Sequence, residues 1–435
     1  MNIKFLPVLM LLLANSSILF GQEEITTYYD LEKSQIKEEY RMVDGHITGP
    51  YKLYYENGAL QTSGQWKDGK REGLFVYFSP EKGDTLKVVN FKDDKREGES
   101  YSYDLDENLI QIARFAADML EGEMNTYYPD GSIKQKTIFF ANKPHGQSIQ
   151  YFPSGEVMNI ANYDHGVLDG VFKTFYENGQ LSSLEHYEDG QLEGELVAYF
   201  PSGKLEEKAI YKSGQQNGEF ISYFENGTVA QKGQYKNGKP EGKFQSFYNT
   251  GSLREEAEYK NGIPFGQQRI NFPSGKKAET IAYNKDGQKI SHEFFHENGA
   301  VHKIIKFSNK LPEGIVNVYD DQGNTIEIIP YKQGQWDGSY KRFDQNGQIL
   351  LERNFKAGLK HGEEKEYYPN GKLKSITTFD LDWRMGPYKH YTENGLLKEE
   401  GSYWYNKKYQ EWTYFDQDGA ILKTEIFNKE GKLIK

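Results

Sequence analysis

The segment His292–His302 has the residue types and the spacing of a hydrolytic zinc site. It contains His292, Glu293, His296 and His302, with Gly299 between the last two histidines. Imidazole nitrogens bind Zn²⁺ at ~2.0–2.1 Å, and an adjacent glutamate can act as general base toward a metal-bound water. This chemistry requires the first two histidines to lie one turn apart on a helix, so that both rings reach the same ion. The elements that carry the segment therefore decide whether it can bind zinc.

A 24-residue repeat contains this segment and extends along almost the whole chain. Its marker is a glycine, as at Gly218, Gly242 and Gly266, which are 24 residues apart. We number this glycine as position 0. Aromatic or apolar residues recur at +2, +5, +6 and +17, and turn glycines recur at +9 and +20. Position +17 is aromatic in 16 successive repeats, from Trp66 to Phe427, with one inserted residue in the second of them. Such periodicity is typical of a stacked repeat architecture.

Each repeat is predicted to form two short strands, at +1 to +6 and at +11 to +17. The turns between them carry Asn-Gly or Ser-Gly, and Asn-Gly favours a tight hairpin because both residues tolerate positive φ. Two glycine turns in every 24 residues leave no helix-length window. We therefore predict an all-β protein, an elongated single-layer antiparallel β-meander of tandem β-hairpin repeats, similar to a solenoid-like rod. Pairing +6 with +11 would place +2, +6, +11 and +17 on one face and +5 on the other.

The repeat argues against the zinc site, although the string matches the metzincin signature. Phe295 occupies +5, Gly299 occupies +9 and Phe307 occupies +17 of its repeat. On a strand, residues four apart are separated by ~13 Å. In the expected pairing His302 faces the opposite side of the sheet from His292 and His296. We expect no catalytic site, and a metzincin-like zinc protease using His292, Glu293, His296 and His302 is the enzymatic alternative.

Two other groups of polar residues are of types that can bind a metal ion. Asp104, Asp106 and Asn108 resemble the start of a calcium loop, but Leu109 stands where such a loop needs glycine. We interpret this segment as a polar turn. His145 and His361 each precede a repeat glycine and are predicted to be exposed turn residues rather than ligands. The sequence thus predicts no metal site and no cofactor.

The repeat resembles the MORN-repeat superfamily, specifically the bacterial MORN-variant repeat. The resemblance rests on Gly-x-Phe-x-x-Tyr/Phe-Tyr-x-Asn-Gly-x-Leu and Tyr-Lys-Asn-Gly-Lys-x-x-Gly, which are complete at 218–242 and nearly so at 49–73, 170–194, 242–266 and 362–386. It covers residues 25–435, or about 17 repeats, and the repeats at 25, 98 and 290 depart from it in their local turns. The resemblance implies a scaffold without chemistry of its own. Such proteins are often labelled as the antitoxin of a toxin–antitoxin pair.

Composition and the N-terminus restrict the partners and the location. The net charge is −11, which disfavours nucleic acid and excludes a basic face for anionic membrane. There is no cysteine, so disulfides, thiolate zinc sites and lipid attachment at an N-terminal cysteine are excluded. Residues 1–22 have the short apolar run of a signal peptide, which predicts export to the periplasm or medium, and not as a lipoprotein.

The combined prediction is an exported, non-catalytic repeat scaffold that mediates protein–protein interaction. The expected partner is a protein, either a toxin or a component of the cell envelope, and self-association through terminal strands is a further expectation because open strand edges invite pairing. The non-enzymatic alternative is a glycan-binding or membrane-associated structural rod.

Overall fold

The computed structural model describes residues 21–435, which form two compact units, 21–215 and 216–435. The predicted signal peptide lies outside the described residues, except that Gly21 is a turn residue and Gln22 already begins the first strand. All regular elements among the described residues are strands, and no helix that could span a membrane occurs in this part of the chain.

The first unit contains the strands β1 to β19. Their bounds are β1 (Gln22–Tyr28), β2 (Ile36–Val43), β3 (His46–Tyr54), β4 (Leu60–Lys67), β5 (Lys70–Arg71), β6 (Gly73–Phe78), β7 (Thr85–Lys92), β8 (Lys95–Tyr103), β9 (Leu109–Ala116), β10 (Met119–Tyr127), β11 (Ile133–Phe140), β12 (Lys143–Tyr151), β13 (Val157–Asp164), β14 (Val167–Leu168), β15 (Gly170–Phe175), β16 (Leu181–Glu188), β17 (Gln191–Leu192), β18 (Gly194–Tyr199) and β19 (Leu205–Lys212).

The second unit contains the strands β20 to β39. Their bounds are β20 (Gln215–Tyr223), β21 (Val229–Lys236), β22 (Lys239–Phe247), β23 (Leu253–Lys260), β24 (Ile263–Asn271), β25 (Lys277–Tyr283), β26 (Lys289–Phe295), β27 (Val301–Ser308), β28 (Leu311–Pro312), β29 (Gly314–Tyr319), β30 (Thr325–Lys332), β31 (Gln335–Trp336), β32 (Gly338–Phe343), β33 (Ile349–Lys356), β34 (Leu359–Tyr367), β35 (Leu373–Asp380), β36 (Trp383–Tyr391), β37 (Leu397–Trp404), β38 (Lys407–Phe415) and β39 (Ile421–Phe427).

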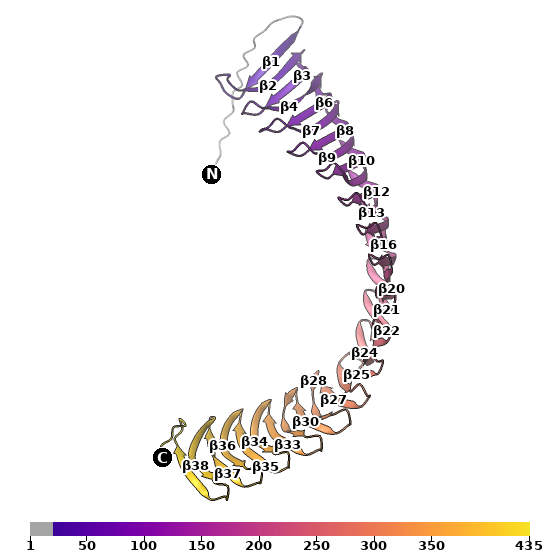
Figure 1. The fold of residues 1–435 in the computed structure, drawn as a ribbon. Coiled ribbons are helices and arrows are strands. Elements are labelled where there is room, and N and C mark those ends of the chain that lie inside the picture. The colour runs from indigo at the N-terminus through magenta and orange to yellow at the C-terminus, as the bar shows by residue number, and fades with distance from the viewer. Residues whose placement is uncertain (1–20) are drawn as a thin grey trace. The chain divides into compact units, whose positions relative to one another are not determined.

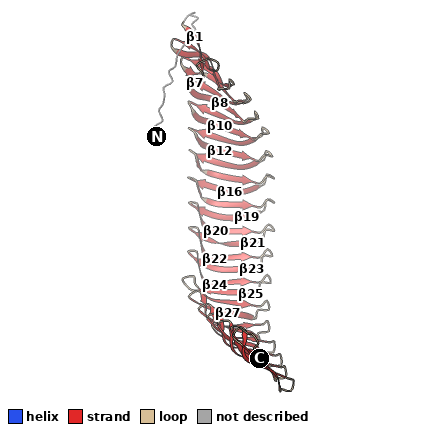
Figure 2. Cartoon of the chain, turned by 90° about the vertical axis from the view of Figure 1, so that its left-hand side faces the viewer, coloured by secondary structure: helices blue, strands red, loops and turns tan. Residues whose placement is uncertain are grey.

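Within each unit the strands form a single-layer antiparallel meander, as predicted. They follow one another in chain order (Figures 1 and 2), and each repeat supplies one hairpin. No second layer of the described residues covers either side of the sheet. Each hairpin is therefore held mainly by the strands on either side of it, as expected for a repeat protein.

The pairing inside the hairpin has the predicted register, with +2 and +17 on one face, except at the end next to the first turn. In the repeat of Gly242, Phe247 at +5 pairs with Leu253 at +11, and Tyr248 at +6 belongs to the turn. The register then shifts, so that Gly242 pairs with Tyr259. Because paired side chains lie on the same side of a sheet, +11 shares a face with +5 and not with +2. The prediction that +6 pairs with +11 was wrong because position +12 is bulged out of the ladder.

The first turn also differs from the expected two-residue hairpin. The amide of Tyr55 donates to the carbonyl of Ala59 at 2.8 Å, and the amide of Gly58 donates to the carbonyl of Tyr55 at 2.9 Å. Only Gly58 has positive φ, at 82°, whereas Asn57 does not. The connection is longer than a two-residue turn and is closed by a glycine in the left-handed conformation. Asn57 contributes through its side chain rather than through its backbone conformation. It donates from Nδ2 to the carbonyl of Pro80 in the next repeat at 2.7 Å.

The second turn has the tight geometry that was expected at the first turn. Asn261 and Gly262 both have positive φ, 50° and 80°. The carboxylate of Glu241, at position −1, accepts a hydrogen bond from the amide of Asn261 at 2.6 Å. Glutamate, aspartate or asparagine makes the equivalent contact in most other repeats, as Glu193 does with the amide of Ser213. This turn is therefore capped by the residue that precedes the repeat glycine.

The repeat glycine itself lies in a bulge between successive hairpins. Strand β21 pairs with β22 through Lys232 and Gln245, and then through Gln234 and Glu241, so extra residues are accommodated around Gly242. Gly242 has φ of 72°, a conformation that residues with a Cβ rarely adopt. The repeat with Ile290 in this position lacks this arrangement, and its preceding turn, 284–288, has the longer form closed by Gly287.

The two faces of the sheet differ in composition. The aromatic face carries positions +2, +4, +13, +15 and +17, and the mixed face carries +1, +3, +5, +14 and +16. Most of the buried residues lie on the aromatic face, including Phe75, Phe91 and Trp412. Aromatic rings at +2 and +17 alternate in edge-on contact along it, as in the series Phe220, Tyr235, Phe244 and Tyr259. This face holds the core of both units.

The tyrosine at +6 joins consecutive repeats through one hydrogen bond. Its hydroxyl donates to the carbonyl of +5 in the next repeat, as Tyr248 does to Asn271 at 2.7 Å. The same contact occurs from Tyr55, Tyr128, Tyr176 and Tyr368.

Replacing Tyr248 with phenylalanine is expected to weaken this junction by about 1 kcal/mol, the usual net value of one hydrogen bond. Amide exchange of the turn 248–252 should accelerate by about fivefold when local opening controls it. The control is Tyr223→Phe, because the hydroxyl of Tyr223 makes no hydrogen bond within residues 21–435. Equal acceleration in both variants would contradict the assigned role of the contact.

Candidate functional site

The three histidines of the zinc-like string do not converge in the structure. His292 lies on the aromatic face of β26, where its Nε2 is 2.7 Å from a carboxylate oxygen of Glu279. His296 and His302 lie together at the first turn, with His296 Nε2 and His302 Nδ1 3.2 Å apart. Both of these nitrogens face the carbonyl oxygen of Tyr319, at 2.9 and 3.0 Å. His296 thus replaces the tyrosine that joins repeats elsewhere.

The prediction that His292 and His296 share a face opposite His302 was therefore wrong. His296 lies in the turn rather than on the strand, and His302 occupies the bulged position +12, so the turn brings these two rings together. Glu293, the candidate general base, pairs with Ile304 on the mixed face, whereas its neighbour His292 points to the aromatic face. The general base and the first ligand of the metzincin arrangement are consequently separated by the sheet.

The calcium-like segment is a capped turn. Asp104 Oδ1 accepts hydrogen bonds from the amides of Asp106 and Asn108, both at 2.9 Å, and Asp104 Oδ2 accepts one from Asn108 Nδ2 at 3.0 Å. The bonds from the Asn108 side chain and amide lower the pKa of Asp104. Asp320 makes the same contacts with Gln322 and Asn324. The carboxylate thus completes its own turn, as the polar-turn interpretation requires.

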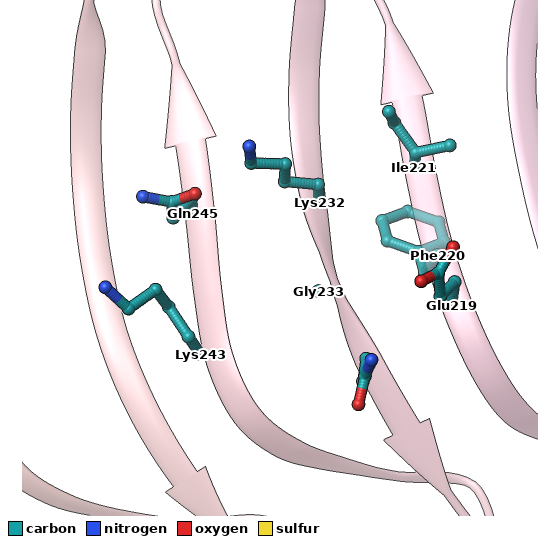
Figure 3. A pocket seen from close by; sticks show the side chains of 8 residues that line it. Glu219, Phe220, Ile221, Lys232, Gly233, Lys243 and Gln245 are labelled. Carbon is teal, nitrogen blue, oxygen red and sulfur yellow. The ribbon is translucent and has the colours of Figure 1, made fainter.

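A shallow hollow of about 450 Å³ lies over β20, β21 and β22. Its rim carries Glu219, Lys232, Lys243 and Gln245, whose side chains project from these neighbouring strands (Figure 3). The charged groups remain in contact with solvent, so the hollow lacks the apolar enclosure that ligand pockets usually provide.

One group of potential ligands was missed by the sequence analysis. His145, Asp164 and His165 lie together at the second turn of one repeat, at positions −1, +18 and +19. The repeat numbering could have indicated this group, because the second turn brings position +19 back beside position −1. His361 does lie at the equivalent turn position, where it contacts Asp380 at 3.1 Å.

Another surface feature is a row of paired residues along the middle of the mixed face. Positions +3 and +14 pair in register from strand to strand throughout the first unit. The apolar members of the row are Val76, Val88, Tyr101, Ile112, Ile149, Ile160, Leu184 and Val197. Apolar side chains on the same face beside the row are exposed, with Leu74 59% and Val171 39% accessible.

The same row has a different character in the second unit. It includes Lys232, Glu256, Arg269, Glu293, Lys341, Glu352, Lys365, Lys389 and Glu400. Neighbouring members form ion pairs, such as Lys341 with Glu352 at 2.8 Å and Lys389 with Glu400 at 3.1 Å. Exposed pairs of this kind contribute little stability. Isoleucines also occur in this row, at Ile221, Ile304, Ile328 and Ile376, and Ile315 beside it is 70% exposed.

Tyrosine burial in the sheet predicts loss of stability in alkali. Burial raises the pKa of Tyr51, Tyr187 and Tyr340 to about 12, whereas unfolded tyrosines titrate near ~10. A raised pKa in the fold contributes stability below the unfolded pKa, and this stability is lost as the pH rises from ~10 toward 12.

Absorbance at alkaline pH should therefore show a class of tyrosines that ionise late, together with loss of β-structure by circular dichroism. The chain in concentrated urea, the control, should ionise as one class near ~10. Simultaneous early ionisation of all tyrosines in a sheet that stays folded would contradict the burial argument.

The repeats match a known family model, described as the MORN repeat variant. The match covers nine segments, which are 47–68, 120–142, 144–165, 168–189, 192–213, 216–237, 240–261, 336–357 and 360–380. Each of them begins at position −2 of a repeat and holds one hairpin with its first turn. The chain is a MORN-variant repeat protein. The MORN-variant description concerns the repeat and names no activity.

Comparison with curated proteins gives no match. Among solved structures, the MORN-variant array is similar to the crystal structure of TcdB2-TccC3-Cdc42, at 11% identity and a TM-score of 0.13, covering 93% of this chain and 25% of that one. It is also similar to the Tc holotoxin pore of Photorhabdus luminescens, at 13% identity and a TM-score of 0.14, covering 94% of this chain and 28% of that one. The chain spans about a quarter of the length of these structures, and scores this low support no assignment of architecture or function.

Proposed function

We propose that this MORN-variant array is an exported, non-catalytic scaffold that binds a protein through the mixed face of residues 21–215. The observation that carries the proposal is the apolar row on that face. A protein interface needs contiguous apolar area at its centre with polar groups around it. Here the longest apolar stretch of the row runs from Val76 to Ile112. Asn125, Lys136 and Lys173 separate it from two shorter apolar pairs, Ile149 with Ile160 and Leu184 with Val197.

The exposed side chains next to the row extend the apolar area. Leu74, Ile138, Val171 and Ile210 are between 39% and 59% accessible, and all four lie on the mixed face. Exposed apolar residues that gather on one face mark interaction sites more often than scattered ones do. The mixed face of the second unit provides an internal comparison, because charged residues outnumber apolar ones along its row.

The non-catalytic part of the proposal is supported by the placement of the candidate groups. His292 and Glu293 point to opposite faces, and His296 and His302 contact the carbonyl of Tyr319. A protein partner is favoured over nucleic acid because the chain carries a net charge of −11. Export is proposed on the apolar run within residues 1–22, and a toxin is one class of partner that the antitoxin resemblance suggests.

The test is affinity capture from the native cell envelope with the full exported chain as bait. We expect one protein in a fixed ratio to the bait, and its loss when Leu74→Glu and Val171→Glu are combined. Both residues occupy position +1. The matched control combines Gln267→Glu and Ser339→Glu, which place the same charge at the same exposed position in the second unit.

Loss of the partner in the first variant alone would support binding through the first unit. Equal loss in both variants, or capture unaffected by either, would contradict it. Recovery of polysaccharide without protein would instead support the glycan-binding alternative. Neutralisation of a recovered toxic protein by the array would support the antitoxin interpretation.

A further inference from the structure

We propose that His145, Asp164 and His165 form a binding site for one divalent transition-metal ion, with Zn²⁺ as the representative ion. Each residue offers one ligand atom, and these atoms all lie within 4.8 Å of one another. Two imidazoles and one carboxylate are a ligand set that suits zinc and related ions. This site is independent of the proposed protein interface and of the string at His292.

The two distances from the carboxylate to the imidazoles are close to those between ligands of a common ion. Asp164 Oδ1 lies 3.0 Å from His145 Nδ1 and 2.6 Å from His165 Nδ1. Metal–ligand bonds of ~2.0–2.1 Å place neighbouring ligand atoms about 2.9 Å apart at a right angle and about 3.4 Å apart at the tetrahedral angle. The three side chains are 45%, 59% and 61% exposed, so they can adjust by a few tenths of an ångström.

The group departs from the arrangement found in most other repeats. In those repeats the residue at −1 is an acceptor that caps the amide of +19, as Glu121 does for Ala141 at 3.0 Å. In this repeat His145 Nδ1 is 3.5 Å from the amide of His165, at the limit of a hydrogen bond. Both imidazoles turn instead toward a single carboxylate oxygen of Asp164. In this turn the side chains therefore contact one another through nitrogen and oxygen atoms, and the cap of the +19 amide is long.

The surroundings hold the two rings in place. The rings of His145 and His165 are 4.9 Å apart, and the ring of Phe140 lies 5.8 Å from the first and 6.1 Å from the second. Phe140 belongs to the preceding repeat, so the group sits against a neighbouring hairpin. Three protein ligands leave coordination positions for water or for a group supplied by another molecule.

The chain offers a matched turn that lacks one ligand. In the repeat of Gly362, His361 and Asp380 occupy the same positions and are 3.1 Å apart, but Leu381 stands where the second histidine would be. Leu381 and His165 both have φ of 47°. Leucine is therefore compatible with the turn, and His165→Leu removes the ligand without imposing a new backbone conformation.

The experiment is calorimetric titration of the untagged, chelator-treated full chain with ZnCl₂. We expect one ion per chain, at least tenfold weaker binding in His165→Leu and in His145→Ala, and unchanged binding in His361→Ala. Leu381→His should raise the stoichiometry to two. Circular dichroism should show the same thermal midpoint for His165→Leu as for the parent chain.

The absence of zinc binding in the parent chain would overturn the proposal. Binding that persists in His165→Leu, or that disappears in His296→Ala, would overturn it too, because the ion would then occupy another place such as the pair His296 and His302. Zinc located by anomalous scattering between His145 and His165 would support the assignment directly.

Discussion

Replacing Trp412 with alanine is expected to destabilise the strands around it by about 3–5 kcal/mol, the usual cost of removing a large buried aromatic side chain. Trp412 is fully buried. Its ring stacks on Tyr388 at 5.4 Å and meets Tyr403 edge-on at 5.1 Å. Its Nε1 donates to the carbonyl of Ser402 at 3.0 Å, so the substitution also leaves an acceptor without its donor.

The effect should be local, because repeats in such an array contact mainly their neighbours. Amide exchange should accelerate in β36 to β39 and remain unchanged in β22 and β23. Trp383→Ala is the control, since Trp383 is 48% exposed at the start of β36, and it should cost less than about 1 kcal/mol. Similar losses in the two variants would contradict a role for burial at Trp412.

Replacing Gly233 with valine is expected to destabilise the second unit by about 1–3 kcal/mol through overpacking. A Cβ at Gly233 would lie 2.6 Å from the ring of Phe244, which occupies +2 of the next repeat. The side chains at +15 and at +2 of the next repeat have complementary sizes. Glycine at +15 faces Phe244, whereas Val89 at the equivalent position faces Ser100, and both members of that pair are buried.

This pairing supplies a double-mutant test. Combining Gly233→Val with Phe244→Ser reproduces the pair found at Val89 and Ser100. Denaturation of the four proteins should give a favourable coupling energy of at least about 1 kcal/mol, because contacting residues are not additive. Strict additivity would show that the ring and the missing Cβ do not compete for the same space.

The sequence determined the architecture because the evidence for it was local and repeated. The aromatic period marks strands wherever it occurs. This prediction was confirmed, together with the single-layer antiparallel meander and the absence of helix from residues 21–435. The tight Asn-Gly turn expected between the two strands of a repeat occurs instead at the second turn, as at Asn261 and Gly262. The departures predicted at the repeat of position 290 were also found in its turn.

The pairing at the turn end of each hairpin and the side-chain groups were decided by the tertiary structure. The bulge at +12 makes +5 rather than +6 the partner of +11, and a period-two argument fails at any such extra residue. For that reason His302 lies beside His296, and the sheet separates His292 from Glu293. The group of His145, Asp164 and His165 likewise depends on how a turn folds back on its own strand. The amino-acid sequence thus determines which residues repeat. The bulges and turns determine which side chains come into contact, because a shift of one residue moves a side chain to the other face of the sheet.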